Sequence, residues 1–207
     1  MACSMNEISM KPFSEACEQN KIPILDVLRR HLTTQNTLLE IGSGTGQHAV
    51  YFSERLPHVT WQPTDVDSNL PGIRAWINES PRDNLREPLS LNVHTGQWPD
   101  HDFHYVYSAN TAHIMSWTEV EHMFQGVGRN LLPGGRFALY GPFNYQGRYT
   151  SESNERFDQW LKNRDPASGL RDFAEVNELA QQSGMELLDD FAMPVNNRTL
   201  VWQKPFI

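Results

Sequence analysis

One stretch of the sequence, Leu38 to Ala49, reads LLEIGSGTGQHA and limits the possible folds more than any other. It begins as an apolar run typical of a buried strand, Thr37 to Ile41, and continues into a loop with glycines at 42, 44 and 46. A helix is predicted to follow from Gln47 to Leu56. Alternate glycines let the backbone turn sharply and approach a ligand closely. Strand, glycine loop and helix N-terminus together predict an α/β fold that binds a nucleotide-like or carboxylate-bearing ligand.

The spacing of the glycines narrows the choice of ligand. A dinucleotide fingerprint reads G-x-G-x-x-G, and here Gln47 occupies the position of its third glycine. The loop reads instead E-x-G-x-G-x-G, from Glu40 to Gly46, which resembles motif I of the class I S-adenosylmethionine (SAM) methyltransferases. In that family the loop passes under the methionine part of SAM. The resemblance implies that Glu40, the acid at the strand end, lies near the SAM amino group.

Composition and charge exclude several classes of protein. The 207 residues suit one α/β domain, and the net charge of −8 argues against a nucleic-acid partner. The two cysteines, Cys3 and Cys17, make neither a disulfide framework nor a metal cluster, so a reducing cytoplasm is favoured. No apolar run approaches the roughly 20 residues of a membrane span, and no signal-peptide pattern is present. We therefore expect a cytoplasmic protein without membrane, nucleic-acid or metal partners, whose oligomeric state stays open.

Two further strands end in residues suited to binding an adenosine. The predicted strand Val59 to Asp65 ends in an acid, which can accept hydrogen bonds from ribose hydroxyls. Asp67 is a second candidate for that role. The predicted strand Pro88 to Val93 contains Asn92 where the methyltransferase pattern usually has an acid that holds the adenine amino group. The carbonyl of Asn92 can accept the same hydrogen bond.

A polar pair follows the fourth predicted strand, Phe103 to Ser108. Ligands of a doubly wound parallel sheet sit at the carboxyl ends of its strands, and Asn110 and His113 fall just past this end. Two interpretations of His113 stay open. It can act as a general base, since an unperturbed imidazole has a pKa of about 6.5. Alternatively, it forms a hydrogen bond that holds the loop.

Hydrophobic patterns and caps predict the rest of the chain. Pro23 is predicted to open a helix from Ile24 to His31, and Ser116 with Glu119 forms a capping box that opens a helix to about Leu131. A hairpin is expected around Asn196-Asn197, because asparagine tolerates positive φ. The remaining predicted elements are a helix from Asn69 to Glu79 and strands Arg136–Tyr140, Met185–Met193 and Thr199–Gln203.

Two segments outside the sheet are candidates for covering the site. Residues 1–33 are expected to form an N-terminal helical flap, although residues 10–20 also fit a helix that packs outside the sheet. Residues 144–172 are expected to be an insert on the acceptor side. Within that insert, hydroxyls, amides and acids crowd between Arg148 and Asp158, which is more than one helix cap requires.

Blocks spread over nearly the whole chain strengthen the resemblance. These blocks are EQNKIPIL at 18–25, LLEIGSGTGQHA, WQPTD at 61–65, NTAHI at 110–114, LYGPF at 139–143, TSESN at 150–154 and MPVNN at 193–197. Together they resemble a family of small class I SAM-dependent methyltransferases that includes methyltransferase-like protein 26. The resemblance implies a single domain over 1–207 with a Rossmann-like, seven-stranded, mostly parallel sheet and a C-terminal antiparallel hairpin. It also implies SAM as cofactor and S-adenosylhomocysteine (SAH) as product.

The expected site residues fall into three groups. Those expected to bind the cofactor are Glu40, Gly42, Ser43, Gly44, Gly46, His48, Asp65, Val66, Asn92, Val93 and Asn110. Those expected to take part in catalysis are His113, Tyr140 and Asn110. Those expected to bind the substrate are Asn20, Phe143, Ser151 and Asn154.

The predicted function is methyl transfer from SAM to a small polar metabolite. SAM already carries a sulfonium, so such an enzyme works by alignment and desolvation and needs no catalytic triad. Alternatives stay open: an RNA or protein methyltransferase, and a SAM-binding protein without turnover. A nucleotide oxidoreductase is disfavoured by Gln47.

Overall fold

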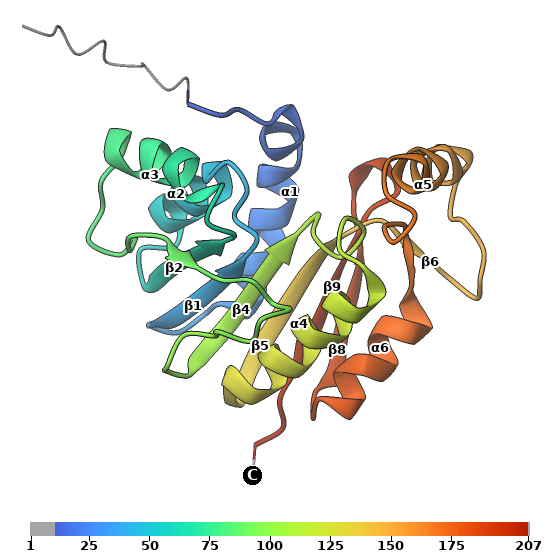
Figure 1. Ribbon diagram of the computed structural model, residues 1–207. Coiled ribbons are helices and arrows are strands. Elements are labelled where there is room, and N and C mark those ends of the chain that lie inside the picture. The colour runs from blue at the N-terminus through green and yellow to red at the C-terminus, as the bar shows by residue number, and fades with distance from the viewer. Residues whose placement is uncertain (1–10, 207) are drawn as a thin grey trace, which may run out of the picture.

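The computed structural model describes residues 11–206, which form a seven-stranded sheet flanked by helices on both faces (Figure 1). The strand order is β3-β2-β1-β4-β5-β9-β8, with β9 antiparallel to both of its neighbours. The strands are β1 (Asn36–Ile41), β2 (Val59–Asp65), β3 (Leu89–Ser90), β4 (Phe103–Ala109), β5 (Leu131–Gly141), β8 (Glu186–Ala192) and β9 (Arg198–Gln203). The predicted α/β, Rossmann-like, mostly parallel sheet with a C-terminal antiparallel hairpin is confirmed.

Six α-helices accompany these strands in the described part of the chain. They are α1 (Glu15–His31), α2 (Gln47–Arg55), α3 (Leu70–Glu79), α4 (Trp117–Asn130), α5 (Glu152–Arg164) and α6 (Phe173–Gln182). A two-stranded sheet of β6 (Phe143–Asn144) and β7 (Arg171–Asp172) joins the segment around α5 to the main sheet, and a short 3₁₀ turn, η1 (Pro194–Asn196), links β8 to β9.

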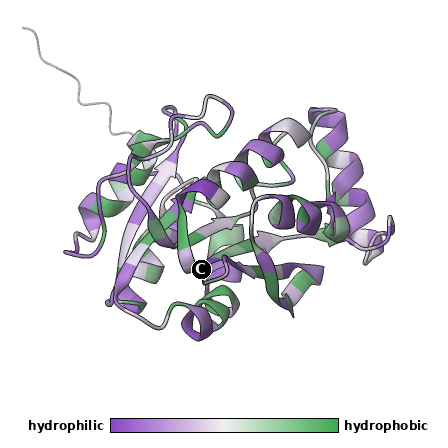
Figure 2. Cartoon of the chain, turned by 90° about the horizontal axis from the view of Figure 1, so that it is seen from below, coloured by the Kyte–Doolittle hydropathy of each residue, from purple (hydrophilic) through white to green (hydrophobic). Residues whose placement is uncertain are grey.

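Alternation along the strands divides the core into two layers. Leu38, Tyr107 and Val201 pack on one face with α1, α2 and α3, and their neighbours Leu39, Val106 and Leu200 pack on the other face with α4 and α6. Successive side chains of a strand point to opposite faces, so a strand covered on both faces is apolar throughout. Figure 2 shows this apolar interior between more hydrophilic outer helix faces.

The chain reverses its direction of travel across the sheet between β1 and β4, which lie side by side and parallel. Such a switch point leaves a crevice at the carboxyl ends of the two strands, because the connecting helices leave in opposite directions. In Figure 1 this edge lies at the top, between α1 and α5.

The N-terminal helix is longer than predicted. Pro23 does not open a helix but lies inside α1, which runs without interruption from Glu15 to His31. Proline in a helix interior costs one backbone hydrogen bond and is normally disruptive. Here Ile24, directly after the proline, and Leu28, one turn further on, are fully buried against the sheet, and this packing stabilises the helix around the proline. Cys3 and the first ten residues of the expected 1–33 flap lie outside the described residues.

Two strands differ from their predicted lengths. The third is only Leu89–Ser90, because Asn92 Oδ1 accepts the backbone N–H of His94 (2.9 Å) and turns the chain out of the ladder. The fifth begins at Leu131 instead of Arg136, and its register against β4 shifts between Phe103 and Tyr105 to absorb the extra residues. The carboxyl end of β5, at Gly141, lies one residue from the predicted end at Tyr140.

Several local predictions are confirmed. Ser116 and Glu119 form the reciprocal capping box at α4. β8 and β9 pair as an antiparallel hairpin whose turn has positive φ at Asn196. Within residues 11–206, no helix combines the length and apolar character needed to cross a membrane.

Candidate functional site

A cleft of about 690 Å³, here named the main cleft, opens at the carboxyl ends of β1, β2 and β4. Its floor comes from the segments that follow these strands and the β3 segment, and its walls come from the start of α1 and from α5. The lining residues that the sequence analysis expected are Gly42, Ser43, Gly44, His48, Asp65, Val66, Asn92, Val93, Asn110 and His113. Its volume lies within the roughly 300–1,000 Å³ typical of small-molecule sites.

The glycine loop needs its glycines for distinct reasons. A Cβ on Gly42 would stand 2.5 Å from Cγ2 of Thr111, so this glycine lets the ends of β1 and β4 approach each other. Gly44 has a φ of +59° and nothing within 4 Å of its Cβ position. It therefore turns in a conformation that side-chain-bearing residues rarely adopt, and it presents bare backbone to the main cleft.

Asp65 holds this loop. Its Oδ2 accepts a hydrogen bond from the backbone N–H of Gly44 (2.7 Å). Its Oδ1 accepts hydrogen bonds from the backbone N–H of Val66 (2.8 Å) and from the side-chain amide of Asn69 (2.9 Å). Asp65 lines the main cleft, whereas Asp67 is exposed and does not. Asp65 and Asp67 were both candidates for binding ribose hydroxyls, and the geometry favours Asp65.

Glu40 lies behind the loop and does not line the main cleft. Its side chain is 2% exposed, and Oε2 accepts the indole N–H of Trp61 (2.8 Å). Burial raises the pKa of Glu40 to about 7, against the hydrogen bonds from Trp61 and Ser43 that lower it. The resemblance implies that Glu40 contacts the SAM amino group. In this structure its carboxylate instead faces Trp61 and does not reach the main cleft.

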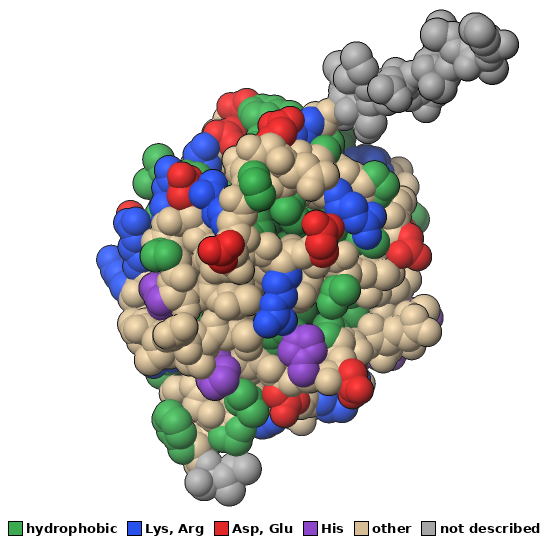
Figure 3. Space-filling view, turned by 90° about the vertical axis from the view of Figure 1, so that its left-hand side faces the viewer, with side chains coloured by type: hydrophobic (Ala, Val, Ile, Leu, Met, Phe, Trp, Pro, Cys, Tyr) green, Lys and Arg blue, Asp and Glu red, His purple; other side chains and the backbone are tan. Residues whose placement is uncertain are grey.

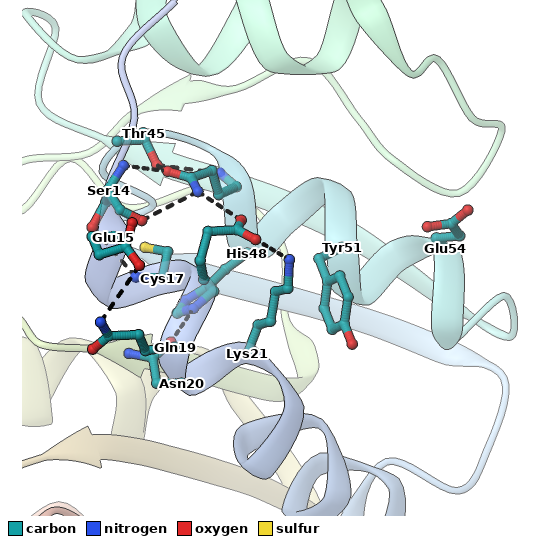
Figure 4. Close-up of polar contacts among 12 residues, drawn as sticks. Ser14, Glu15, Cys17, Gln19, Asn20, Lys21, Thr45, His48, Tyr51 and Glu54 are labelled. Atoms are coloured by element: carbon teal, nitrogen blue, oxygen red, sulfur yellow. Dashed lines mark hydrogen bonds and ion pairs between the residues drawn. The ribbon is translucent and has the colours of Figure 1, made fainter. Parts of the chain in front are cut away.

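Gln47 links the start of α1 to the glycine loop. Its Oε1 accepts the backbone N–H of Ser14 (2.6 Å) and the hydroxyl of Thr45 (3.0 Å), and its Nε2 donates to Glu18 (2.9 Å). Figure 4 shows Ser14 and Thr45 brought together at this point. Gln47 thus attaches the start of α1 beside the main cleft, a role that the glycine spacing does not indicate.

A second link joins α1 to α2 and the sheet. His48 Nε2 and Asn20 Oδ1 lie 2.7 Å apart (Figure 4). The hydroxyl of Tyr107 lies 3.2 Å from His48 Nδ1. Since the Asn20 oxygen only accepts, His48 donates a hydrogen bond from Nε2 and accepts one from the Tyr107 hydroxyl at Nδ1. Burial lowers the pKa of His48 to about 4, so the ring stays neutral in this row.

The segment after β4 is held in place from several sides. Ser108 Oγ lies 2.7 Å from Thr111 Oγ1 and donates to the carbonyl of Ile41 (2.7 Å), which joins the ends of β4 and β1. Asn110 has a φ of +57°, and its backbone N–H donates to the carbonyl of Tyr140 (2.9 Å). Arg171 donates to the carbonyl of Ala112 (3.0 Å) and to that of Met115.

His113 is a buried, neutral histidine beside the main cleft. Its ring packs edge-on against Phe157 with centroids 5.2 Å apart, and its backbone carbonyl accepts the N–H of Gly169 (2.9 Å). Burial, and then the guanidinium of Arg171, lower the pKa of His113 to about 4. A proton acceptor is thus available at neutral pH, although a weaker base than a solvent-exposed histidine.

A smaller cavity of about 270 Å³, here named the side cavity, adjoins the main cleft. It is built from α1, the end of β5, α5 and the turn between β8 and β9. Its lining residues are Ala16, Gln19, Asn20, Pro23, Asn110, Tyr140, Pro142, Ser153, Asn154, Phe157, Pro194, Val195 and Asn197. Ala16, Asn110 and Phe157 line both spaces, so the two meet at these residues.

A family model described as "Protein of unknown function (DUF938)" matches residues 11–204, nearly the whole chain. The chain belongs to this family.

Solved structures identify the fold. An O-methyltransferase family protein from Burkholderia thailandensis matches with a TM-score of 0.79 and 15% identity, over 89% of this chain and 56% of that one. An O-methyltransferase family 2 protein from Planctomyces limnophilus, in complex with apigenin, matches with a TM-score of 0.80 and 12% identity, over 91% and 58%. Human N-acetylserotonin methyltransferase, in complex with SAM, gives 0.68 and 12%, over 82% and 47%. This chain therefore spans about half of each of these proteins and shares their Rossmann-like methyltransferase fold.

In this DUF938 protein, some expected site residues lie away from both spaces. Phe143 is 1% exposed in the core between the sheet and α4, and its neighbour Pro142 lines the side cavity instead. Ser151 caps α5 by accepting the backbone N–H of Asn154 (3.1 Å), and Ser153 takes its expected place on the wall. Gly46 is the residue before α2 and likewise lines neither space.

Other lining residues were missed by the sequence analysis. Three of them, Trp160, Leu161 and Arg164, come from α5 and extend the wall of the main cleft. Val195 and Asn197 come from the β8–β9 turn and close the side cavity. The hairpin itself was predicted, but nothing local to it indicates that it folds back onto α5.

The surface shown in Figure 3 carries acidic and basic side chains interspersed, without a large area of one sign. A stripe of positive charge on one face is the usual mark of a nucleic-acid partner. Within residues 11–206, no cluster of three or more His, Cys, Asp or Glu side chains is placed to hold a metal ion.

Proposed function

We propose that this DUF938 protein is a methyltransferase that binds SAM in the main cleft and a small polar acceptor in the side cavity. The observation that carries the proposal is the meeting of the two spaces at Asn110, beside a glycine loop that Asp65 holds open. Two adjoining spaces at the switch point of a methyltransferase fold suit a cofactor and an acceptor, because the methyl group must pass directly from one to the other.

The residues present fit the cofactor. Gly44 leaves open space where any side chain would intrude, and Asp65 stands at the cleft wall for the ribose hydroxyls. The same cleft is lined by Val66, Asn92 and Val93, which we assign to the adenine next to the ribose. When bound, SAM supplies a methyl group whose carbon leaves sulfur, with the bonding pair staying on sulfur, and joins a lone pair of the acceptor.

The chain's own residues align the acceptor and exclude water. Asn110 stands at the junction, with a backbone conformation fixed through the carbonyl of Tyr140. The Tyr140 phenol lies in the side cavity, and burial raises its pKa, so it stays protonated and donates a hydrogen bond. His113, with its lowered pKa, is available to take up a proton that the acceptor loses.

Finer assignments rest on the sequence. The blocks at 110–114, 150–154 and 193–197 support a place beside the small class I methyltransferases that include methyltransferase-like protein 26. Helix α1, which forms a wall of both spaces, supports a covering role for the 1–33 segment, and α5 supports an acceptor-side role for 144–172. We also propose a single domain over 1–207 that works in the cytoplasm.

Transfer of labelled methyl from SAM tests the proposal. The protein is incubated with labelled SAM and with a cell extract separated into a small-molecule and a macromolecular fraction. Label in the small-molecule fraction, incorporated more slowly with Tyr140→Phe but not with Tyr105→Phe, supports the proposal. Tyr105 is a suitable control because it lies at the far end of the sheet, where its hydroxyl meets Thr34 (2.6 Å).

Other outcomes contradict the proposal in distinct ways. Label only in the macromolecular fraction favours an RNA or protein methyltransferase. No label in either fraction, with SAM bound tightly in equilibrium dialysis, favours a binding protein without turnover.

A further inference from the structure

The side cavity is polar yet carries no formal charge on any of its described lining residues. Its polar groups are the carboxamides of Gln19, Asn20, Asn110, Asn154 and Asn197, the hydroxyl of Ser153 and the phenol of Tyr140. Transfer of an isolated ion into such surroundings is strongly unfavourable, whereas neutral groups are satisfied by amides and hydroxyls. A charged ligand would therefore lack a partner in the side cavity.

Asn154 supplies a hydrogen-bond acceptor to this space. The side chain is 5% exposed, and its Nδ2 donates to Thr150 Oγ1 (2.8 Å) and to the carbonyl of Asn196 (3.2 Å). The bond to Asn196 fixes the orientation of the amide, because a backbone carbonyl only accepts. Within residues 11–206, Oδ1 has no hydrogen-bond partner. It is not among the buried atoms that lack a partner, so it is open to the side cavity, where a ligand or water can donate a hydrogen bond to it.

Tyr140 supplies the complementary donor. The amides of Asn20 and Asn197 lie beside its hydroxyl oxygen and oppose the rise in pKa that burial causes. Because the raised pKa keeps the phenol protonated and Tyr140 lines the side cavity, its hydroxyl is available there as a donor. The side cavity thus pairs an acceptor on α5 with a donor at the end of β5.

We infer that the methyl acceptor of this protein is a small molecule without net charge, which donates a hydrogen bond to Asn154 Oδ1 and accepts one from Tyr140. The inference rests on the proposed function and adds the chemical class of the acceptor. At about 270 Å³ the side cavity lies below the range for drug-sized ligands, so the acceptor is compact. The acceptor atom attacks as a neutral nucleophile, and its proton leaves to His113 or to water.

Sorting by charge tests the inference. Full-length protein saturated with SAH is mixed with small-molecule extract that ion exchange has divided into cationic, anionic and uncharged fractions. Compounds retained through gel filtration are identified by mass spectrometry, and each fraction is assayed for labelled methyl transfer from SAM. We expect retention and transfer with the uncharged fraction alone.

The outcomes separate this inference from the proposed function. Retention or transfer with a charged fraction overturns the inference and leaves the methyltransferase assignment standing. Retention of an uncharged compound without any transfer supports the inference and contradicts the assignment. Neither retention nor transfer with any fraction contradicts both.

A matched pair of variants provides a second test that does not depend on a buried residue. Val195 lines the side cavity, is 75% exposed and has a φ of +58°, which asparagine and aspartate tolerate better than valine. Val195→Asn and Val195→Asp therefore differ mainly in charge. We expect both to bind the retained compound equally. A cationic acceptor would bind the aspartate variant about fivefold more tightly, an anionic one about fivefold more weakly, and either result overturns the inference.

Asn154→Leu tests the acceptor oxygen directly. We expect it to lose at least about tenfold in retention of the compound while SAH affinity stays unchanged. Undiminished retention in a folded Asn154→Leu protein would contradict the role of Oδ1. If this variant fails to fold, the Val195 pair still decides the charge of the acceptor.

Discussion

The main cleft and the side cavity are built from the chain in different ways. The floor of the main cleft comes from residues that directly follow β1, β2 and β4, at one edge of one sheet. The side cavity joins α1, the end of β5, α5 and the β8–β9 turn, whose members Asn20 and Val195 are far apart in the sequence. The floor of the main cleft is thus formed by local sequence motifs at the strand ends. The side cavity forms only when distant segments pack together.

This difference means that the main cleft and the side cavity depend on separate parts of the chain. The cleft needs a glycine loop and an acid at fixed strand ends, and the scaffold supplies both. The side cavity depends on how α1 and α5 are attached, through contacts such as Gln47 with Ser14 and Asn154 with Asn196. Changes in those attachments would reshape the side cavity without altering the glycine loop.

The largest expected effect is on the main cleft, from Gly44→Val. The branched side chain projects into open cleft space at a φ of +59°, so we expect SAM binding to fall below detection in calorimetry. Gly184→Val is the matched control, since Gly184 also has positive φ and an open Cβ position but lies at the end of α6. Equal loss of SAM affinity in both variants would show that backbone strain, and not the cleft, causes the effect.

The second effect is on the pH dependence of stability and concerns Glu40, which is buried behind the glycine loop. Its pKa is raised to about 7, so between the unfolded value near 4.5 and pH 7 the folded state binds a proton that the unfolded state does not. The free energy of unfolding therefore decreases as pH rises through this window, by on the order of 3 kcal/mol. Urea titrations of Glu40→Gln should lack this dependence, whereas exposed Glu87→Gln should keep it.

The same variant tests whether Glu40 contacts the cofactor. Because its side chain lies behind the loop, we expect Glu40→Gln to change SAM affinity less than Asp65→Ala does. A larger loss with Glu40→Gln would restore the amino-group contact that the sequence resemblance implies.

The third effect is a loss of SAM affinity with Asp65→Ala. Removal of the carboxylate frees the Gly44 N–H and removes the ribose partner, which should cost about 1–3 kcal/mol of binding free energy. Asp67→Ala, two residues further on and exposed, is the control and should bind SAM as the wild type does. If calorimetry reverses this order, Asp67 is the ribose acid.

The fourth effect is smaller and belongs to the side cavity. Tyr140→Phe removes one neutral hydrogen bond to the acceptor, so we expect about a 3- to 10-fold loss of kcat/KM for methyl transfer. SAM affinity should stay within about twofold, because Tyr140 lines only the side cavity. A parallel loss of SAM affinity would mean that the two spaces are not separate binding sites.

The smallest effect is on the pH profile. A base must be unprotonated, and the lowered pKa of His113, about 4, keeps its ring neutral down to about pH 5. The initial rate of methyl transfer should therefore stay nearly level from pH 8 to 5 and fall toward pH 4, with circular dichroism confirming that the fold persists. His113→Gln should lower the rate and remove the fall. A decline centred near pH 6.5 would instead indicate an exposed histidine.

The sequence predicts the sheet well because strand alternation, glycine spacing and caps are local signals. The capping box at Ser116 and the hairpin at Asn196 both form as predicted. The helix break at Pro23 and the full length of the third strand were wrong, since the buried packing of Ile24 and the turn at Asn92 override local preference. The wall residues of α5, such as Trp160, were not predicted, because only tertiary contacts place them beside the main cleft.

The central claim, that the main cleft is a SAM site and not a dinucleotide site, is tested most directly by calorimetric titration of the wild-type protein. SAM, SAH and NAD are titrated separately under the same conditions, with Gly44→Val as the negative control. The account predicts micromolar-range binding of SAM and SAH, no binding of NAD, and no SAM binding by the variant. Tighter binding of NAD than of SAM would contradict it.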